Sequence, residues 1–81
     1  MNRMTKIVEV EWEDACTKSS WDSIEDYMDN ETATCFSVGY LLKKDKESVT
    51  LVLTQAPDHD GCNGAITIPL NWITNMKILR K

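Results

Sequence analysis

No run of apolar residues in this chain approaches the roughly 20 residues that a helix needs to cross a bilayer. Segment 1–6 leads straight into a candidate strand and contains no apolar centre of a signal peptide. These absences predict a cytoplasmic protein that has no membrane partner.

The cysteines are too few and too widely spaced for a disulfide framework or a zinc knuckle. No Cys-x-x-Cys pair is present, although three cysteines and His59 would supply four zinc ligands. A structural zinc site usually draws at least two ligands from one short knuckle, so ordinary packing or free thiols in a reducing compartment fit the spacing better. We expect no metal and no cofactor. The cysteines are Cys16, Cys35 and Cys62.

Positive charge is nearly absent from the first part of the chain. Segment 9–31 contains nine acidic residues and one base, Lys18, whereas bases gather at 43–46 and 77–81. The net charge of -4, with 42% apolar and 27% charged residues, is ordinary for a soluble domain, and 81 residues predict a single one, 1–81. This acidic field disfavours a long nucleic acid but permits a short anion at a local basic spot. The acidic segment and the basic spots could also meet across a subunit interface of a homo-oligomer.

Alternation of apolar and polar residues predicts five strands. In the third strand, Val49, Leu51 and Leu53 alternate with threonines that suit an outer, partly wet face. Gly39 is the expected bending point of the second strand. Polar residues predict a loop over 56–64. The expected strands lie at 7–12, 34–43, 49–54, around 66–68 and around 76–78.

One short helix is expected after the first strand. Residues 19–22 have the form of a capping box, with Asp22 in the place of the usual Glu, and Asn30 is the expected end. The apolar residues of this segment fall at helical spacing and should pack the helix onto the sheet, together with Trp12. These residues are Trp21, Ile24 and Met28.

The resulting order, strand, helix, three strands, turn, strand, predicts a mainly β small barrel of five antiparallel strands, because closure removes exposed edges. It resembles the Src-homology-3-like and Sm-like folds, in which one helical turn separates the last two strands. Residues 69–73 would form that turn. In the Sm-like family the helix usually precedes the first strand, so the strand at 7–12 favours the Src-homology-type arrangement.

A more local pattern resembles small proteins of phages and prophages. It comprises Val10 to Ala15, a serine-rich step to Trp21, Ser37 to Leu42, and Ile66 to Pro69. The resemblance implies a setting in a bacterial host cell and no catalytic residues. Such proteins are often accessory factors that bind a host protein, a nucleic acid or a signalling molecule.

Two sets of residues are candidates for binding. Asp22, Asp26 and Asp29 lie at helical spacing and could meet a basic partner, and Trp72 at the last turn is either a core residue or an interface anchor. A second set would form a basic, aromatic surface for a small anion at a hairpin tip. Its members are Lys43, Lys44, Lys46 and Tyr40.

Catalysis is not expected. His59 lies between two acids in the predicted loop, with Cys62 nearby, but the spacing does not fit a calcium loop and no third group orients a nucleophile. We therefore expect a non-enzymatic accessory protein that binds a host protein in host modulation or counter-defence. The alternatives are an oligomeric barrel that sequesters a small nucleotide, and a barrel that binds RNA or DNA.

Overall fold

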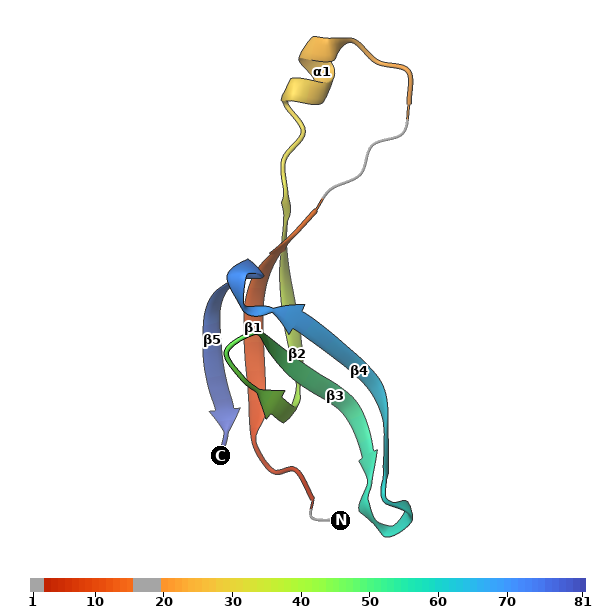
Figure 1. The fold of residues 1–81 in the computed structure, drawn as a ribbon, viewed down its shortest axis with the longest axis vertical. Coiled ribbons are helices and arrows are strands. Elements are labelled where there is room, and N and C mark those ends of the chain that lie inside the picture. The colour runs from red at the N-terminus through yellow and green to blue at the C-terminus, as the bar shows by residue number, and fades with distance from the viewer. Residues whose placement is uncertain (1–2, 16–19) are drawn as a thin grey trace.

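A computed structural model describes residues 3–15 and 20–81 (Figure 1). It contains five strands, one α-helix and two short 3-10 helices. In chain order these are β1 (Ile7–Asp14), α1 (Ile24–Met28), β2 (Ala33–Lys44), β3 (Ser48–Ala56), η1 (Pro57–His59), β4 (Gly61–Pro69), η2 (Leu70–Trp72) and β5 (Ile73–Arg80). The expected order of strands, helix and turn is therefore confirmed.

All five strands belong to one antiparallel sheet with the order β4-β3-β2-β1-β5. β1 lies between β2 and β5, so the last strand returns to the first. In the described part of the chain β4 and β5 are the two edges and do not pair with each other, which leaves the sheet open. The structure shows a mainly β fold with one helix. No described helix has the length and apolar character that a membrane span requires.

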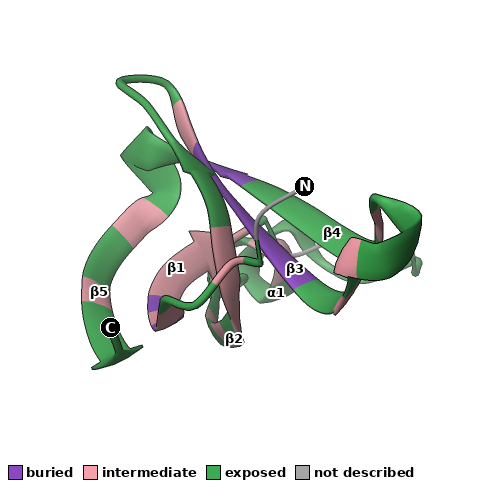
Figure 2. Ribbon diagram, turned by 90° about the horizontal axis from the view of Figure 1, so that it is seen from below, coloured by how far each residue is buried: buried purple, intermediate pink, exposed green. Residues whose placement is uncertain are grey.

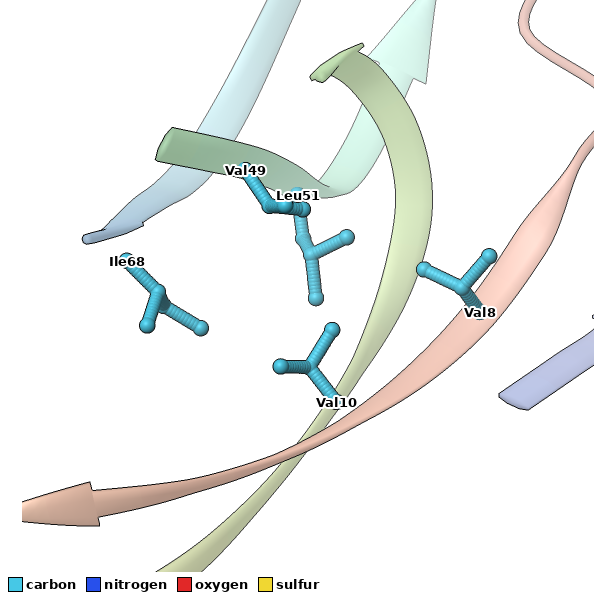
Figure 3. Close-up of a cluster of buried hydrophobic side chains, with 5 residues drawn as sticks. All are labelled: Val8, Val10, Val49, Leu51 and Ile68. Atoms are coloured by element: carbon cyan, nitrogen blue, oxygen red, sulfur yellow. The ribbon is translucent and has the colours of Figure 1, made fainter. Parts of the chain in front are cut away.

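The core is a small apolar cluster on one side of the sheet. Side chains from β1, β3 and β4 point toward one another in Figure 3, and all are at most 2% exposed. Trp12, Leu41, Ile73 and Met76 pack against them and are partly buried. The alternation in β1 predicted this face correctly. The cluster consists of Val8, Val10, Val49, Leu51 and Ile68.

The predicted buried face of β3 is confirmed only for the first half of the strand. Val49 and Leu51 are buried, but Leu53 is 72% exposed, whereas Thr50 and Val52 on the alternate face are buried. Figure 2 shows buried residues in the middle of β3 and exposed ones toward its end. The hairpin of β3 and β4 extends past the core, so the apolar alternation continues where no second layer covers it.

Gly39 marks a close approach between β2 and β3. A Cβ atom there would lie 2.9 Å from the backbone oxygen of Val52 and 3.2 Å from the Cβ of Leu51. Only glycine lets the coiled strand come this near. The expected special role of Gly39 therefore has a direct steric basis.

Two turns fix the paths between strands. The Asp45 carboxylate accepts hydrogen bonds from the backbone N–H groups of Glu47 (2.8 Å) and Ser48 (2.9 Å) in the turn between β2 and β3. The backbone N–H of Leu70 in η2 donates to the oxygen of Glu47 at 2.9 Å. The β2–β3 turn is thereby fastened to the helical turn that was predicted before the last strand.

The polar segment 56–64 is not one loop. Residues 57–59 form η1, and Asp60 has a left-handed backbone with φ 51°. β4 begins at Gly61, so Cys62 and Asn63 pair with β3 opposite Gln55 and Thr54. The expectation of a loop through Gly64 was wrong, because a tight hairpin lets the ladder start immediately after the turn.

The predicted packing of the helix onto the sheet is also wrong. The ends of β1 and β2 run together away from the sheet and carry α1 at the far end (Figure 1). We call this projection the arm, and residues 20–29 the arm tip. α1 contains no buried residue. Its predicted apolar face is therefore not buried by any part of the described chain.

Candidate functional site

The arm tip is held together by local hydrogen bonds. The Ser23 hydroxyl accepts from the backbone N–H of Asp26 at 3.2 Å and caps α1. The helix thus begins later than the predicted capping box at 19–22 implies, because Ser23, which follows that segment, takes the N-cap position. The Tyr27 hydroxyl accepts from the Ser20 N–H at 3.1 Å and donates to the Ser20 carbonyl. This contact closes the tip into a compact loop.

Three large apolar side chains of the tip face solvent. Trp21 is fully exposed, Ile24 is 81% exposed and Met28 is 77% exposed. Exposed apolar residues that occur singly are normal, but a group at the end of a projecting arm is typical of an interaction surface. The tip also carries an open hollow of about 390 Å³ lined by Ser20, Trp21, Asp22 and Tyr27.

The arm tip also carries carboxylates, although not as the helical row that the sequence predicted. Asp26 lies in the first turn of α1, together with Glu25, and Asp29 is the C-cap. Asp22 precedes the N-cap, and its carboxylate accepts a hydrogen bond from the Ser20 hydroxyl at 2.5 Å. The three predicted acids nevertheless share the arm tip, so a role of Asp22, Asp26 and Asp29 in binding stays a prediction.

Trp72 lies in η2, away from α1 (Figure 1). Its ring stacks on that of Trp12, with 6.3 Å between the centroids and 15° between the planes. The Trp12 indole N–H donates to the Ser37 hydroxyl at 3.0 Å. Trp72 is 43% exposed, so it both packs on the sheet and offers one face to solvent. The structure does not bring it together with the acids of the tip.

The predicted basic surface is divided between two places. Lys43, Lys44 and Lys46 are exposed at the β2–β3 turn next to η2, and the Lys43 ammonium lies 3.2 Å from the Asp45 carboxylate. Tyr40 lies instead where β2 pairs with the start of β1, opposite Ile7. A role of these four residues in holding an anion stays a prediction.

Two arginines accompany Tyr40: Arg80, from the basic group at 77–81, and Arg3, which the sequence analysis did not single out. The Arg80 guanidinium lies 5.9 Å from the centre of the Tyr40 ring, and its Nε donates to the Thr5 carbonyl at 3.1 Å. Arg3, followed by Arg80, lowers the pKa of the Tyr40 hydroxyl from its ordinary value of 10.0 by favouring the phenolate. No local pattern could reveal this group, because its members come from the two ends of the chain and the middle strand.

The other candidates for chemistry lie apart. His59 is in η1 and Cys62 is exposed on β4, whereas Cys35 is on β2 and Cys16 lies outside the described residues. Within 3–15 and 20–81, no three His, Cys, Asp or Glu residues are grouped so that they could hold a metal ion.

Comparison with known proteins identified no relative. No family model, no curated protein and no solved structure matches the chain. Function must therefore be argued from the surface itself.

Proposed function

We propose that this chain is a non-enzymatic binding protein whose arm tip docks onto a basic protein surface with an apolar depression. One observation carries the proposal: α1 buries none of its residues, while Trp21, Ile24 and Met28 stand exposed at the end of the arm. Ordering such an arm costs conformational entropy, and α1 gains no burial within the described chain that would offset this cost. Burial against a partner would supply the missing stabilisation.

The chemistry of the tip matches an interface anchor. Burying side chains of the size of Ile24 and Met28 stabilises by about 1.5–3 kcal/mol each. An exposed tryptophan that enters a pocket often contributes a hot spot, with about 2 kcal/mol or more lost on truncation. The acids of the arm tip would steer a basic partner and reject an acidic one. A partner with a positive rim and an apolar centre fits best.

The wider setting is part of the proposal. The resemblance to phage and prophage proteins makes a host protein the expected partner, and modulation of the host or its defence the expected result. The finer fold assignment, a small barrel of the Src-homology-3-like or Sm-like kind, is supported by the strand order and by η2 before β5. A barrel would need the edges β4 and β5 to be brought together or bridged.

Sequestration of a small anionic nucleotide is the second candidate. The observation that favours it is the group of Arg3, Tyr40 and Arg80, in which two guanidiniums flank one phenol. Arginine forks suit phosphate oxygens, and the tyrosine ring offers a face to a base. Binding of a long RNA or DNA finds less support, since segment 9–31 would repel its backbone.

One pull-down from bacterial lysate tests both candidates. The immobilised protein is compared with Trp21→Ala, with the triple variant Asp22→Lys, Asp26→Lys and Asp29→Lys, and with Leu53→Ala. Leu53 is a matched control, because it is also an exposed large apolar side chain but lies on β3 and not on the arm. Bound proteins and small molecules are identified by mass spectrometry.

We expect proteins that bind the unaltered chain to be lost from both tip variants and retained by Leu53→Ala. Equal capture by all four proteins would refute docking through the tip. A nucleotide in the eluate that persists in the tip variants and disappears with Arg80→Ala would support the second candidate instead.

A further inference from the structure

The two ends of the molecule carry opposite charge. Nine carboxylates and one lysine occupy 9–31, so the rest of the chain, at a total of -4, carries an excess of four positive charges. Of these carboxylates, Asp22, Glu25, Asp26 and Asp29 lie at the arm tip, whereas Glu9 to Asp14 belong to β1. The molecule is 54 Å long and only 23 by 20 Å across, and the arm tip stands at one end of it (Figure 1). The chain is therefore a long electrical dipole with its negative end at the arm tip.

The positive end lies where the first strand begins and the last strand ends. Arg80 pairs in register with Ile7, and its side chain bonds to the Thr5 carbonyl, so the residues flanking β1 and β5 share this region. We call Arg3, Lys6, Arg80 and Lys81 the basic end. Ile78 and Leu79 beside it are about half exposed. The carboxylates of Asp58 and Asp60, on the neighbouring β3–β4 hairpin, offset part of its charge without reversing it.

We infer that two copies of this chain pair antiparallel, with the arm tip of each lying on the basic end of the other. The inference rests on the proposed function in one respect, that the arm tip is a protein-docking element. Each end offers what the other lacks: the tip combines exposed apolar groups with acids, and the basic end combines exposed apolar groups with bases.

In an antiparallel pair of elongated molecules, the contact between an arm tip and a basic end occurs twice, once at each end. A twofold axis makes both contacts identical, so the three apolar side chains of one tip become six in the pair. Phe36 and Val38 are exposed on β2 between the tip and the basic end, where they pair with Glu11 and Glu9 of β1, and would add apolar contact area along the length of the pair. A standard stable interface buries about 800 Å² on each partner, which a long side-by-side contact reaches more readily than two touching ends.

The pairing also has a consequence for the proposed function. In the pair the arm tip is covered, so a basic partner has to compete with the basic end of the second copy. Host-protein binding and self-association then oppose each other through mass action.

The experiment is analytical ultracentrifugation of the full chain over a wide range of concentration, at low and at high salt. We expect a monomer–dimer equilibrium that weakens with salt, because the contact depends on exposed charges. Trp21→Ala should raise the dimer dissociation constant by about tenfold or more, as for an interface hot spot. Leu53→Ala should leave it unchanged. A monomer at every concentration overturns the inference.

A charge swap makes the test specific for the antiparallel arrangement. The tip variant Asp22→Lys, Asp26→Lys, Asp29→Lys and the end variant Lys6→Glu, Arg80→Glu, Lys81→Glu should each be monomeric, since each places like charges together at both contacts. Mixed with each other they should form a heterodimer, because one contact is then native and the other is reversed but complementary. Lys43→Glu, Lys44→Glu, Lys46→Glu has the same charge change beside η2 and should not pair with the tip variant.

A mixture that stays monomeric, or pairing of the tip variant with the Lys43, Lys44 and Lys46 control as strong as with the end variant, overturns the arrangement. The two proposals fail separately. A monomeric protein that still captures lysate proteins through its tip loses only the dimer, whereas a dimer whose tip variants capture the same lysate proteins loses only the proposed function.

Discussion

Leu51 and Leu53 form a matched pair that tests where the core of this protein ends. Both are leucines of β3, two residues apart, yet Leu51 is 2% exposed and Leu53 is 72% exposed. Replacement by alanine removes the same atoms from both. The difference in the free energy of unfolding between the two variants therefore reports how deeply each leucine is buried.

The magnitudes follow from the exposed fractions. Leucine to alanine removes the equivalent of three methylene groups, at about 0.8 kcal/mol each when buried, or about 2.4 kcal/mol for Leu51. The cavity that remains among Val8, Val10 and Ile68 raises the cost of Leu51→Ala to about 3–5 kcal/mol. Leu53 buries only about a quarter of its surface, so Leu53→Ala should cost about 0.7 kcal/mol or less and leave no cavity.

Urea denaturation followed by tryptophan fluorescence is a suitable assay, because the stacked pair of Trp12 and Trp72 separates on unfolding. With a urea dependence of about 1 kcal/mol per molar, Leu51→Ala should lower the midpoint by about 3–5 M or prevent folding. Leu53→Ala should lower it by less than about 1 M. All variants are compared at one protein concentration, because self-association would add stability. Equal losses of stability in the two variants would refute the assignment of the core to the first half of β3.

Two further substitutions test single contacts. Gly39→Ala should destabilise by about 1–3 kcal/mol, since the added Cβ would lie 2.9 Å from the Val52 backbone oxygen, which cannot move without shifting β3; unchanged stability in urea would show that β2 and β3 do not approach this closely. Hydrogen bonds from the backbone N–H groups of Glu47 and then Ser48 lower the pKa of Asp45 below its ordinary value of 3.8, with a smaller contribution from Lys43. Its stabilising effect should therefore be complete above the unfolded pKa and be lost as the pH falls through the lower folded pKa. In Asp45→Asn, the melting temperature should therefore fall less as the pH is lowered than it does in the unaltered protein. An equal fall in both proteins would show that Asp45 does not contribute to the acid dependence of stability.

Much of the fold could be predicted because its signals are local. Alternation with a period of two follows from strand geometry itself, and it placed Val8 and Val10 on the core face of β1. Pro69 and the following residues indicated the turn that became η2, and Gly39 marked the place where β2 approaches β3 too closely for a side chain. These residues act through backbone sterics that require no knowledge of distant neighbours.

The errors about burial share one cause. A pattern shows which residues lie on one face, but burial depends on whether another part of the chain covers that face. Leu53 continues the apolar face of β3 beyond the point where β1 and β4 provide cover. Ile24 and Met28 lie in a helix with a proper N-cap, yet the helix stands at the end of the arm, where no part of the described chain buries it.

The sequence by itself therefore determined the order of the strands, the turn before the last strand and the uneven distribution of charge, since these follow from residue-by-residue geometry and composition. Only the tertiary structure decided that the acidic helix projects on an arm, that Tyr40 lies beside Arg3 and Arg80, and that the core is confined to a few residues of β1, β3 and β4. The physical reason is that contacts between distant segments depend on how strands pair and coil. The apolar residues of the arm tip stay exposed because the arm extends beyond the rest of the sheet, where no other strand can bury them.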